Sequence, residues 1–367
     1  MSKFYGFDQN KTASIAKITT AKIALMSGLV VNEDRYITGS ENEIIISGNN
    51  LITVGDSIFK TNQTTLTASD LDEGSSFQIG KDYYIYICDP TDGDDTDYSS
   101  EEYIISLSST YPDGYNSDTS RKIGGFHYGV VRKVNSVGDP INSSNVVLGT
   151  DWESNVFTGI LPNSIWTLTF RPMCDPTGMA YIGNGIWGDI YLSSDNGNNG
   201  VESVYDAYPI TGTEGMSWYT FNEKARRVGK RLASYAEFCQ AAYGSPEGKD
   251  ANNTYAWSKT DNSARQKTGY VQYAVSATNI RDLVGNVWKW LNEFCLDPTA
   301  SSWGWQDVLG SGYGDAYIPS NTALHAFLGG GCWGNGVRGG SRAVSCDNCP
   351  WFGGYAGVGG WCVCDSL

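Results

Sequence analysis

Short hydrophobic runs separated by polar turns dominate the first 165 residues. Runs rich in β-branched and aromatic residues occur at 43–47, 83–88, 103–107 and 146–148, with clusters of Gly, Asn, Asp and Ser between them. Such runs, bounded by turn residues, are typical of strands in a small antiparallel domain. We therefore expect a β-sandwich domain over residues 46–165.

A helical pattern of apolar residues appears only after residue 210. Four such residues recur at helical spacing from Trp218 to Val228, and Gly229 follows them. Glycine commonly ends helices because it adopts the left-handed conformation without strain. The pattern predicts one amphipathic helix over residues 214–228.

A second, shorter helix is predicted over residues 235–243. Ser234 and Glu237 have the spacing of a capping box, in which each side chain bonds the backbone amide of the other residue. Gly244 is expected to end this helix. Both helices fall in the second predicted domain, residues 166–367.

Large aromatic rings, rather than long helices, are expected to fill the core of that domain. Tryptophans lie among turns and short β-type runs at positions 288, 290, 303, 305, 333, 351 and 361. Each ring buries a large apolar area. For Trp288 and Trp290 we favour core packing over stacking on a sugar. The predicted fold class is α+β.

The last stretch of the chain, residues 326–367, differs in composition from the rest. It contains no Lys, Glu, Gln or Met, although the chain has 14 Lys and 13 Glu elsewhere, and it holds five of the nine cysteines. Gly and Cys are enriched instead, and Ser, Asn, Asp, Phe and Tyr are also present. Several of these types serve as contacts in binding surfaces. We expect a display surface here rather than a reaction centre.

The charge and hydropathy of the chain argue against nucleic acid and membrane as partners. The formal net charge is −15, whereas binding to nucleic acid requires clustered Lys and Arg. No run of eighteen apolar residues is present, and residues 1–9 lack the apolar region of a signal peptide. We expect synthesis in the cytoplasm and no membrane insertion.

Few side chains are suited to catalysis or metal binding. His127 and His325 are the only histidines, too few for a histidine-rich metal site, and both are expected to have structural roles. The acidic run at 89–97 lacks the residue order and closing Glu of an EF-hand loop, so a solvated turn is favoured over a calcium site. We expect no metal ion and no cofactor.

The cysteines leave one redox alternative. Cys346 and Cys349 have the spacing of a redox motif, which is active when a helix N-terminus or a cation lowers a thiol pKa. Here Asp347 stands beside Cys346 in an expected loop. In a reducing compartment, free thiols that pack as small hydrophobic groups are favoured over disulfides.

Several blocks of sequence occur in the order found in one version of the C-type lectin fold. They are residues 229–232 (GKRL), 234–238 (SYAEF), 282–290 (DLVGNVWKW), 330–333 (GGCW) and 340–343 (GSRA). Further blocks lie at 121–128 (RKIGGFHY), 170–172 (FRP), 175–179 (DPTGM) and 187–191 (WGDIY). In these blocks the chain resembles the variable proteins of diversity-generating retroelements, which share their fold with formylglycine-generating enzymes.

The resemblance is strongest to the phage tropism-determinant branch of that family. It implies a β-sandwich followed by a C-type lectin-like domain, in a homotrimer at a phage tail fibre. It also implies partners: other tail-fibre proteins, and a host cell-surface protein or other surface ligand that is bound through a hypervariable lectin-fold surface. Residues 1–45 are too few for the β-prism of that branch, so a reduced segment is expected to serve tail attachment or oligomerisation.

The resemblance also implies which positions vary. In such retroelements, adenine mutagenesis turns Asn codons into codons that never encode Lys, Glu, Gln, Met or Trp. In a variable region over about 330–360, the blocks align so that ligand-binding positions fall at Cys332, Gly334, Gly336, Arg338, Ser345, Asp347, Asn348, Phe352, Gly354, Tyr355 and Gly357. Fixed scaffold is expected at Trp288, Trp290, Trp333, Arg342 and Trp351, with the tryptophans supplying buried aromatic area.

Two alternatives to a tail-fibre protein remain open. A cell or a prophage can encode a ligand-binding protein that is diversified in the same way but is not built into a virion. Formylglycine-generating enzymes oxidise a substrate cysteine with a cysteine pair in the corresponding region. Here residues 340–344 contain no Cys, and thiols reappear only at Cys346 and Cys349. We therefore expect no enzymatic activity.

Overall fold

The computed structural model describes residues 35–55, 57–89, 101–141, 155–250, 257, 263–295, 304–306, 314–318 and 323–367. The predicted strand at 146–148 and the acidic run beyond Asp89 lie outside this part of the chain. The chain divides into two compact units. The first comprises Met1–Gln78, Asp82–Phe126 and Ile165–Phe170, and the second comprises Ile79–Lys81, His127–Ser164 and Arg171–Leu367.

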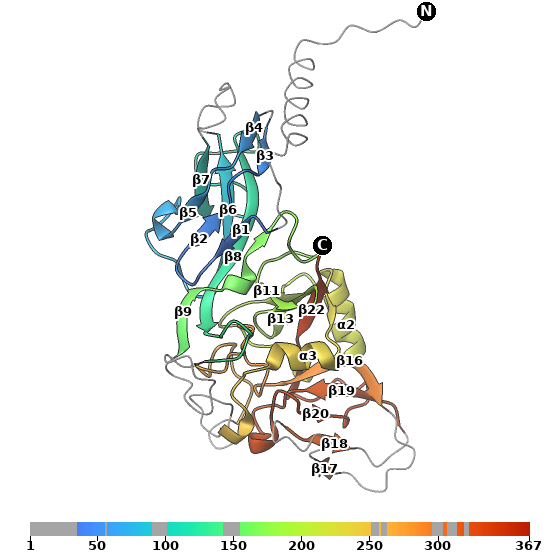
Figure 1. Ribbon diagram of the computed structural model, residues 1–367. Helices are drawn as coiled ribbons and strands as arrows, with labels where there is room; N and C mark the ends of the chain where they lie inside the picture. Colours follow the sequence, from blue (N-terminus) through green and yellow to red (C-terminus); the bar gives the residue numbers. More distant parts are fainter. Residues whose placement is uncertain are drawn as a thin grey trace, which may run out of the picture. The chain divides into compact units, whose positions relative to one another are not determined.

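The first unit is built of antiparallel strands (Figure 1). They are β1 (Ile37–Gly39), β2 (Ile44–Ile46), β3 (Leu51–Val54), β4 (Ser57–Lys60), β5 (Thr64–Leu66), β6 (Lys81–Cys88), β7 (Glu102–Ser106), the first part of β8 (Ser120–Arg132) and β10 (Trp166–Thr167). One sheet has the order β1-β2-β5, another has the order β10-β8-β6-β7, and β3 pairs with β4. The runs predicted at 43–47, 83–88 and 103–107 are confirmed as β2, β6 and β7.

The two larger sheets of this unit enclose its core. Successive side chains of a strand point to opposite faces, and along β6 both Ile85 and Tyr86 are fully buried. The sheets approach closely where Gly124 of β8 faces Ile37 of β1, because a Cβ at Gly124 would lie 2.6 Å from the Ile37 side chain. The Tyr36 hydroxyl donates to the carbonyl of Ile123 (2.9 Å) across the same contact.

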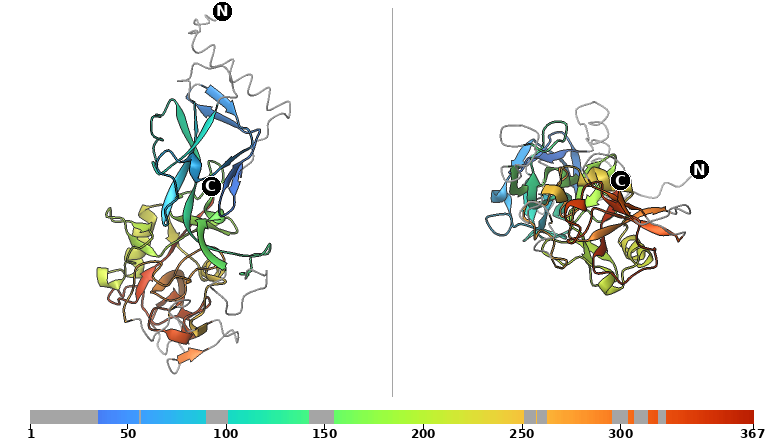
Figure 2. Two further views of the ribbon diagram at one scale, coloured as in Figure 1. Left: turned by 90° about the vertical axis from the view of Figure 1, so that its left-hand side faces the viewer. Right: turned by 90° about the horizontal axis from the view of Figure 1, so that it is seen from below.

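The second unit combines short sheets with two helices (Figures 1 and 2). Its strands are β9 (Val156–Ile160), β11 (Met179–Gly183), β12 (Ile186–Asp189), β13 (Ser193–Asp195), β14 (Val201–Ser203), β15 (Arg231–Leu232), β16 (Trp288–Cys295), β17 (Gly304–Gln306), β18 (Ala316–Ile318), β19 (His325–Gly329), β20 (Val344–Ser345), β21 (Val358–Gly360) and β22 (Cys362–Asp365). One sheet has the order β11-β12-β22-β15, and a six-stranded sheet has the order β17-β18-β20-β19-β16-β21. β13 pairs with β14, and β9 pairs with the end of β8.

The helix predicted over 235–243 is confirmed as α3 (Tyr235–Ala242). Ser234 accepts from the Glu237 amide, and the Glu237 side chain accepts in return from the Ser234 amide, so the capping box is complete. α3 packs against β16 and β19 of the six-stranded sheet, and its buried face includes Phe238 and Ala241.

The other helix, α2 (Trp218–Arg227), begins later than predicted. A 3-10 turn capped by Thr211 occupies Gly212–Glu214, and Gly215 then adopts a left-handed conformation that breaks the helical path. Ser217 caps α2 by accepting from the Thr220 amide. Glu214 therefore lies in a separate turn, because Thr211 caps that turn and Ser217 caps the helix that follows it. The predicted end is confirmed, since Gly229 has a φ of 74°.

The core of the second unit is rich in aromatic rings, as predicted. Trp187, Trp257, Trp290 and Trp361 are among the largest fully buried side chains of the chain. Truncating a buried ring of this size costs about 3 to 5 kcal/mol of stability. The expected α+β class, with two short helices and an aromatic-rich core in the second domain, is confirmed. None of the helices in the described ranges is long and apolar enough to cross a membrane.

Candidate binding surface

The region expected to vary forms two loops that leave and re-enter the six-stranded sheet. The first variable loop, residues 330–343, joins β19 to β20, and the second variable loop, residues 346–357, joins β20 to β21. Both loops lie within the second unit. A binding role requires that their backbones keep one path whatever side chains they carry.

The first variable loop is held by backbone hydrogen bonds to the block at 282–290. The Gly285 amide donates to the Gly330 carbonyl (3.1 Å), and the Trp333 amide donates to the Asn286 carbonyl (3.0 Å). The loop closes on itself where the Gly330 amide donates to the Ala343 carbonyl (2.9 Å). No side chain takes part in these bonds, so side-chain changes leave them available.

A buried lysine and a buried aspartate hold this block in place. Lys289 is fully buried, and its Nζ donates to the carbonyls of Leu283 and Gly285, each at 2.7 Å. Burial lowers the pKa of Lys289 to about 7. Asp282, also fully buried, accepts from the Gly269 amide at 2.7 Å, and burial raises its pKa. These groups satisfy backbone atoms that water cannot reach.

A second anchor of the first variable loop is Glu247, which is 6% exposed. Its carboxylate accepts from the Ser341 amide (2.8 Å) and from the Ser341 hydroxyl (2.6 Å). The neighbouring Gly248 amide donates to the Gly339 carbonyl (2.9 Å). Charge-assisted bonds of this length are strong, so the end of the loop is fixed by residues outside it.

The second variable loop is held in the same way. The amides that hold it belong to α2, β19 and β16, all outside the loop. Those of Trp218, Ala326 and Trp288 donate to the carbonyls of Pro350 (3.0 Å), Asn348 (3.0 Å) and Gly357 (2.7 Å), respectively. The side chains of the loop are therefore not needed for its attachment.

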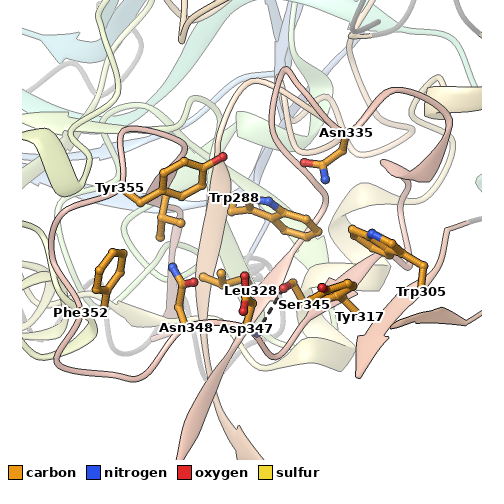
Figure 3. A pocket seen from close by; sticks show the side chains of 11 residues that line it. Trp288, Trp305, Tyr317, Leu328, Asn335, Ser345, Asp347, Asn348, Phe352 and Tyr355 are labelled. Atoms are coloured by element: carbon orange, nitrogen blue, oxygen red, sulfur yellow. Dashed lines mark hydrogen bonds between the residues drawn. The ribbon is translucent and has the colours of Figure 1, made fainter. Parts of the chain in front are cut away.

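A groove of about 430 Å³ opens between the loops and the sheet (Figure 3). We call it the aromatic groove. It is lined by Trp288, Trp305, Tyr317, Leu328, Asn335, Ser345, Asp347, Asn348, Phe352, Tyr355 and Val358. The rings of Trp288 and Trp305 stack with centroids 6.2 Å apart, and Tyr317 follows at 5.0 Å from Trp305. These rings offer π faces to planar or cationic groups.

The polar groups of the groove are few. Asp347 is exposed and belongs to no ion pair among the described residues. The Nδ2 atom of Asn348 is buried and has no hydrogen-bond partner in the described part of the chain. Asn335 is engaged, because its Oδ1 accepts from the Cys332 amide (2.7 Å). Within the described ranges, the groove thus offers a carboxylate without an ion-pair partner, and the unpaired Nδ2 atom of Asn348 lies covered beside it.

Two further contacts shape the rim of the groove. The Arg338 guanidinium lies over the Trp305 ring, 5.4 Å from its centroid. The Tyr355 hydroxyl interacts with the Cys332 thiol, and burial, followed by the charge of Cys332, raises the pKa of Tyr355 to about 12. Tyr355 is therefore protonated and can donate a hydrogen bond at neutral pH.

The structure brings five of the predicted ligand-binding residues together in the groove: Ser345, Asp347, Asn348, Phe352 and Tyr355. Gly334, Arg338 and Gly354 are exposed outside it. Cys332, Gly336 and Gly357 are buried, so the prediction that they face a ligand is wrong. The Cys332 side chain packs into the hydrophobic core, and a Cβ at Gly357 would lie 2.9 Å from the Tyr355 ring.

The residues predicted as scaffold differ in how deeply they are buried. Trp288 and Trp290 are buried in β16, and Trp333 packs partly buried against the core. Trp351 is 62% exposed, so the prediction that it supplies buried aromatic area is wrong. Arg342 is exposed as well, and its carbonyl accepts from the Tyr235 hydroxyl (2.7 Å).

Sequence reasoning missed half of the groove wall. Trp305, Tyr317, Leu328, Asn335 and Val358 line the groove but were not predicted as site residues, and Trp288 was predicted only as scaffold. Trp305 and Tyr317 reach the site through β17 and β18, which join the sheet by pairing β18 with β20 in parallel. A local sequence pattern does not predict such a long-range pairing of strands. The unusual density of tryptophans could have indicated that Trp305 belongs to the site.

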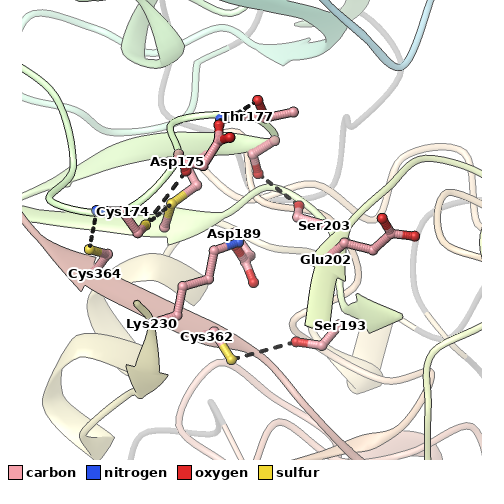
Figure 4. Close-up of polar contacts among 12 residues, drawn as sticks. Cys174, Asp175, Thr177, Asp189, Ser193, Glu202, Ser203, Lys230, Cys362 and Cys364 are labelled. Atoms are coloured by element: carbon pink, nitrogen blue, oxygen red, sulfur yellow. Dashed lines mark hydrogen bonds and ion pairs between the residues drawn. The ribbon is translucent and has the colours of Figure 1, made fainter. Parts of the chain in front are cut away.

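A buried polar cluster elsewhere in the second unit is the arrangement most like a reactive centre (Figure 4). Lys230 and Asp189 form an ion pair at 2.6 Å. The Cys174 amide donates to the Cys364 sulfur (3.3 Å), and the hydrogen bond from the Cys174 thiol lowers the pKa of Cys364 to about 6. All four side chains are at most 9% exposed. Because these side chains are covered, the cluster connects strands and turns of the core and is not exposed to a substrate.

Neither thiol of the pair considered for redox chemistry has a lowered pKa. A hydrogen bond with Cys295 raises the pKa of Cys346, and burial raises the pKa of Cys349. His127 is buried, with Nε2 3.0 Å from the Tyr191 hydroxyl, in keeping with a structural role. In the part of the chain that is described, no three His, Cys, Asp or Glu side chains gather as a metal site requires.

Comparisons with known proteins agree with this architecture. A family model described as the Mtd second domain matches residues 35–153. The tail fiber receptor-binding protein of Bordetella phage BPP-1 is 29% identical over 310 residues, which cover 78% of this chain and 72% of that protein. A shorter match, 28% identical over 139 residues, spans 36% of this chain and only 20% of the serine/threonine-protein kinase Pkn1 of Chlamydia trachomatis.

Solved structures give the same result over nearly the whole chain. The U1 variant of the major tropism determinant matches with a TM-score of 0.66 and 25% identity, covering 92% of this chain and 85% of that one. The P3c variant matches with a TM-score of 0.65 and 25% identity, covering 90% and 83%. Over most of its length the chain is therefore similar to the major tropism determinant, and it has the C-type lectin-like fold expected from the sequence.

Proposed function

We propose that this protein is the receptor-binding protein of a phage or prophage tail fibre and that it binds a host surface ligand through the aromatic groove. One observation carries the proposal. Five side chains at positions expected to vary gather in a single groove, while the backbones of both loops are bonded to residues outside them. A relative over most of the chain is named as a tail fiber receptor-binding protein.

The exposed rings of the groove are suited to anchor a ligand. Phe352 is 46% exposed and Tyr355 is 45% exposed, which is high for side chains of this size. Aromatic rings supply a large contact area with only two rotatable bonds, so little conformational entropy is lost on binding. Asp347 and Asn348 add directional polar contacts beside them. This combination favours recognition of a partner over catalysis.

We also propose that a retroelement diversifies this surface. The bias of residues 326–367 against Lys, Glu, Gln and Met supports the idea, since the expected mutagenesis does not produce these residues. The loop anchors support it physically, because side-chain replacement is tolerated where a rigid scaffold fixes the backbone.

A homotrimer at the fibre is the assembly we propose, with residues 1–45 serving attachment or oligomerisation. A groove of this size gives modest affinity, and several copies on one particle multiply it through avidity. Static light scattering of the purified chain at micromolar concentration tests the assembly. A mass of three chains is expected, and a mass of one chain at every concentration contradicts it.

Binding to intact bacteria tests the proposed function. We expect labelled chain to bind some strains of a bacterial panel, and Phe352→Ala or Tyr355→Ala to weaken that binding by about 1 to 4 kcal/mol as anchors of an interface do. Tyr208→Ala is the matched control, because Tyr208 is 52% exposed and does not line the groove. Equal binding by all three variants and the unchanged chain contradicts the proposal.

A further inference from the structure

The aromatic groove carries a charge pattern that points to one class of ligand group. Among the described residues that line it, Asp347 is the only one charged at neutral pH, and none of them is Lys, Arg or His. A carboxylate without a partner beside aromatic faces attracts a cation from two directions, through its own charge and through the negative faces of the rings. The net charge of −15 on the whole chain adds attraction at longer range.

The Asp347 carboxylate lies among the aromatic side chains of the groove (Figure 3). In Figure 3, Asp347 and Asn348 lie between Phe352 and Tyr355 on one side and Tyr317 and Trp305 on the other. The Trp305 ring of this group is already in contact with a cation, because the Arg338 guanidinium lies over it. That contact pairs one guanidinium with Trp305, and it leaves the Asp347 end for a ligand.

The side-chain amide of Asn348, which has no hydrogen-bond partner in the described part of the chain, sets a second requirement for the ligand. Its buried Nδ2 atom has no hydrogen-bond partner among the described residues, and an unsatisfied buried donor is costly. A ligand with a carbonyl oxygen next to its cationic group removes this cost when the Asn348 side chain turns its buried Nδ2 atom toward that oxygen. A basic residue in a polypeptide has both features, since its backbone carbonyl is close to its side chain.

From these observations we propose that the aromatic groove binds a basic side chain, preferably arginine, of a protein on the host surface. The guanidinium stacks on the rings and directs its N–H groups to the Asp347 carboxylate, while Asn348 donates to a nearby peptide carbonyl. Arginine is favoured over lysine because its planar group can stack and form two parallel bonds at once. This inference rests on the proposed function and names the ligand class for the same site.

A pair of blocked tripeptides tests the inference on the full-length chain. The probes are acetyl-Gly-Arg-Gly-amide and the same peptide with citrulline, which keeps the shape of arginine but has no charge. Binding is measured by ligand-observed NMR at low salt. We expect the arginine peptide to bind about three- to tenfold more tightly, as a partly exposed ion pair with a cation–π contact allows, and the advantage to shrink as salt is added.

Two variants locate the effect. Asp347→Asn keeps the shape of the side chain and is expected to remove the advantage of arginine over citrulline. Glu223→Gln is the matched control, since Glu223 is an exposed carboxylate on α2 outside the groove, and it should leave the advantage unchanged. Equal affinities of the two peptides for the unchanged chain overturn the inference, as does an arginine advantage that survives Asp347→Asn.

A panel of methyl glycosides covers the alternative that the rings stack on sugars. Tight glycoside binding that Asp347→Asn leaves intact overturns the basic side chain as ligand. The cell-binding experiment separates this failure from failure of the proposed function. If Phe352→Ala and Tyr355→Ala abolish cell binding while the two peptides bind alike, the function stands and the ligand class is wrong. If the arginine advantage holds while neither variant affects cell binding, the function is wrong.

Discussion

Residues 282–290 and residues 347–357 both border the aromatic groove, but their side chains lie in opposite environments. Every residue of the first segment is buried, including the charged Asp282 and Lys289. In the second segment most side chains are exposed or half-buried, and only Pro350 and Gly357 are buried. Nevertheless the backbones of both segments take part in hydrogen bonds to other parts of the unit.

The difference shows how a loop keeps its path while its side chains change. In the buried segment, side chains such as Lys289 bond backbone carbonyls and fill the core, so their identity matters for folding. In the exposed segment, the anchors are amides of Trp218, Ala326 and Trp288, which no substitution in the loop removes. Exposed side chains are thereby left free for recognition.

The largest expected effect comes from comparing two tryptophans. Trp290 is fully buried and its Nε1 donates to the Met216 carbonyl (3.3 Å), whereas Trp351 is 62% exposed. We expect Trp290→Ala to lower the free energy of unfolding by about 3 to 5 kcal/mol. Trp351→Ala should change it by less than about 0.5 kcal/mol. Urea unfolding of both variants measures this, and similar losses refute the division between the two segments.

A smaller effect is expected at Lys289. Lys289→Met leaves the carbonyls of Leu283 and Gly285 without their donor, which costs about 1 to 3 kcal/mol of stability. The cost depends on pH. Burial lowers the pKa of Lys289 from 10.5 to about 7, so between these values the folded protein binds fewer protons than the unfolded chain. The wild-type protein therefore gains stability as pH rises through this window.

The pH dependence provides its own measurement. The penalty for a buried charge is complete below pH 7 and disappears above pH 10.5, so the advantage of wild type over Lys289→Met should grow across that range. Lys60→Met is the control, because Lys60 is exposed in the first unit and its removal should add no such slope. If the difference in unfolding free energy between wild type and Lys289→Met stays constant or falls with pH, the lowered pKa of Lys289 is contradicted.

The smallest effect separates two glycines of the first variable loop. Gly334 is exposed, and a Cβ there meets nothing within 4 Å, so Gly334→Ala should be nearly neutral. Gly336 has a φ of 54°, a left-handed conformation that costs other residues about 1 kcal/mol or more. We expect Gly336→Ala to lower the melting temperature and Gly334→Ala to leave it unchanged. The reverse order is evidence against the loop path described above.

Local signals in the sequence were sufficient for much of the fold. The capping box at Ser234 and the left-handed glycine at 229 act within a few residues, so the ends of α3 and α2 there were predictable. The start of α2 was not, because Thr211 caps a separate turn and Gly215 interrupts the path. Competition between neighbouring caps depends on tertiary contacts that a periodic pattern does not report.

The site was predictable only where its chemistry is local to the loops. Phe352, Tyr355 and Asp347 were named from a bias in composition and an aligned block, and they line the groove. Trp351 was misassigned because a tryptophan expected not to vary was taken to be buried, yet its side chain lies at the surface. Cys332 was misassigned for the opposite reason, since its position in the alignment does not reveal that its thiol packs into the core.

On the interpretation given above, the side chains of the two variable loops control binding and do not affect folding. The most direct measurement replaces three exposed ones together, Arg338→Ser, Asp347→Asn and Phe352→Ser, and determines urea unfolding and binding to intact bacteria on the same preparation. We predict a change in unfolding free energy within about 1 kcal/mol, as for exposed positions, together with loss of cell binding. A large loss of stability, or retained binding to the same strains, would contradict the account.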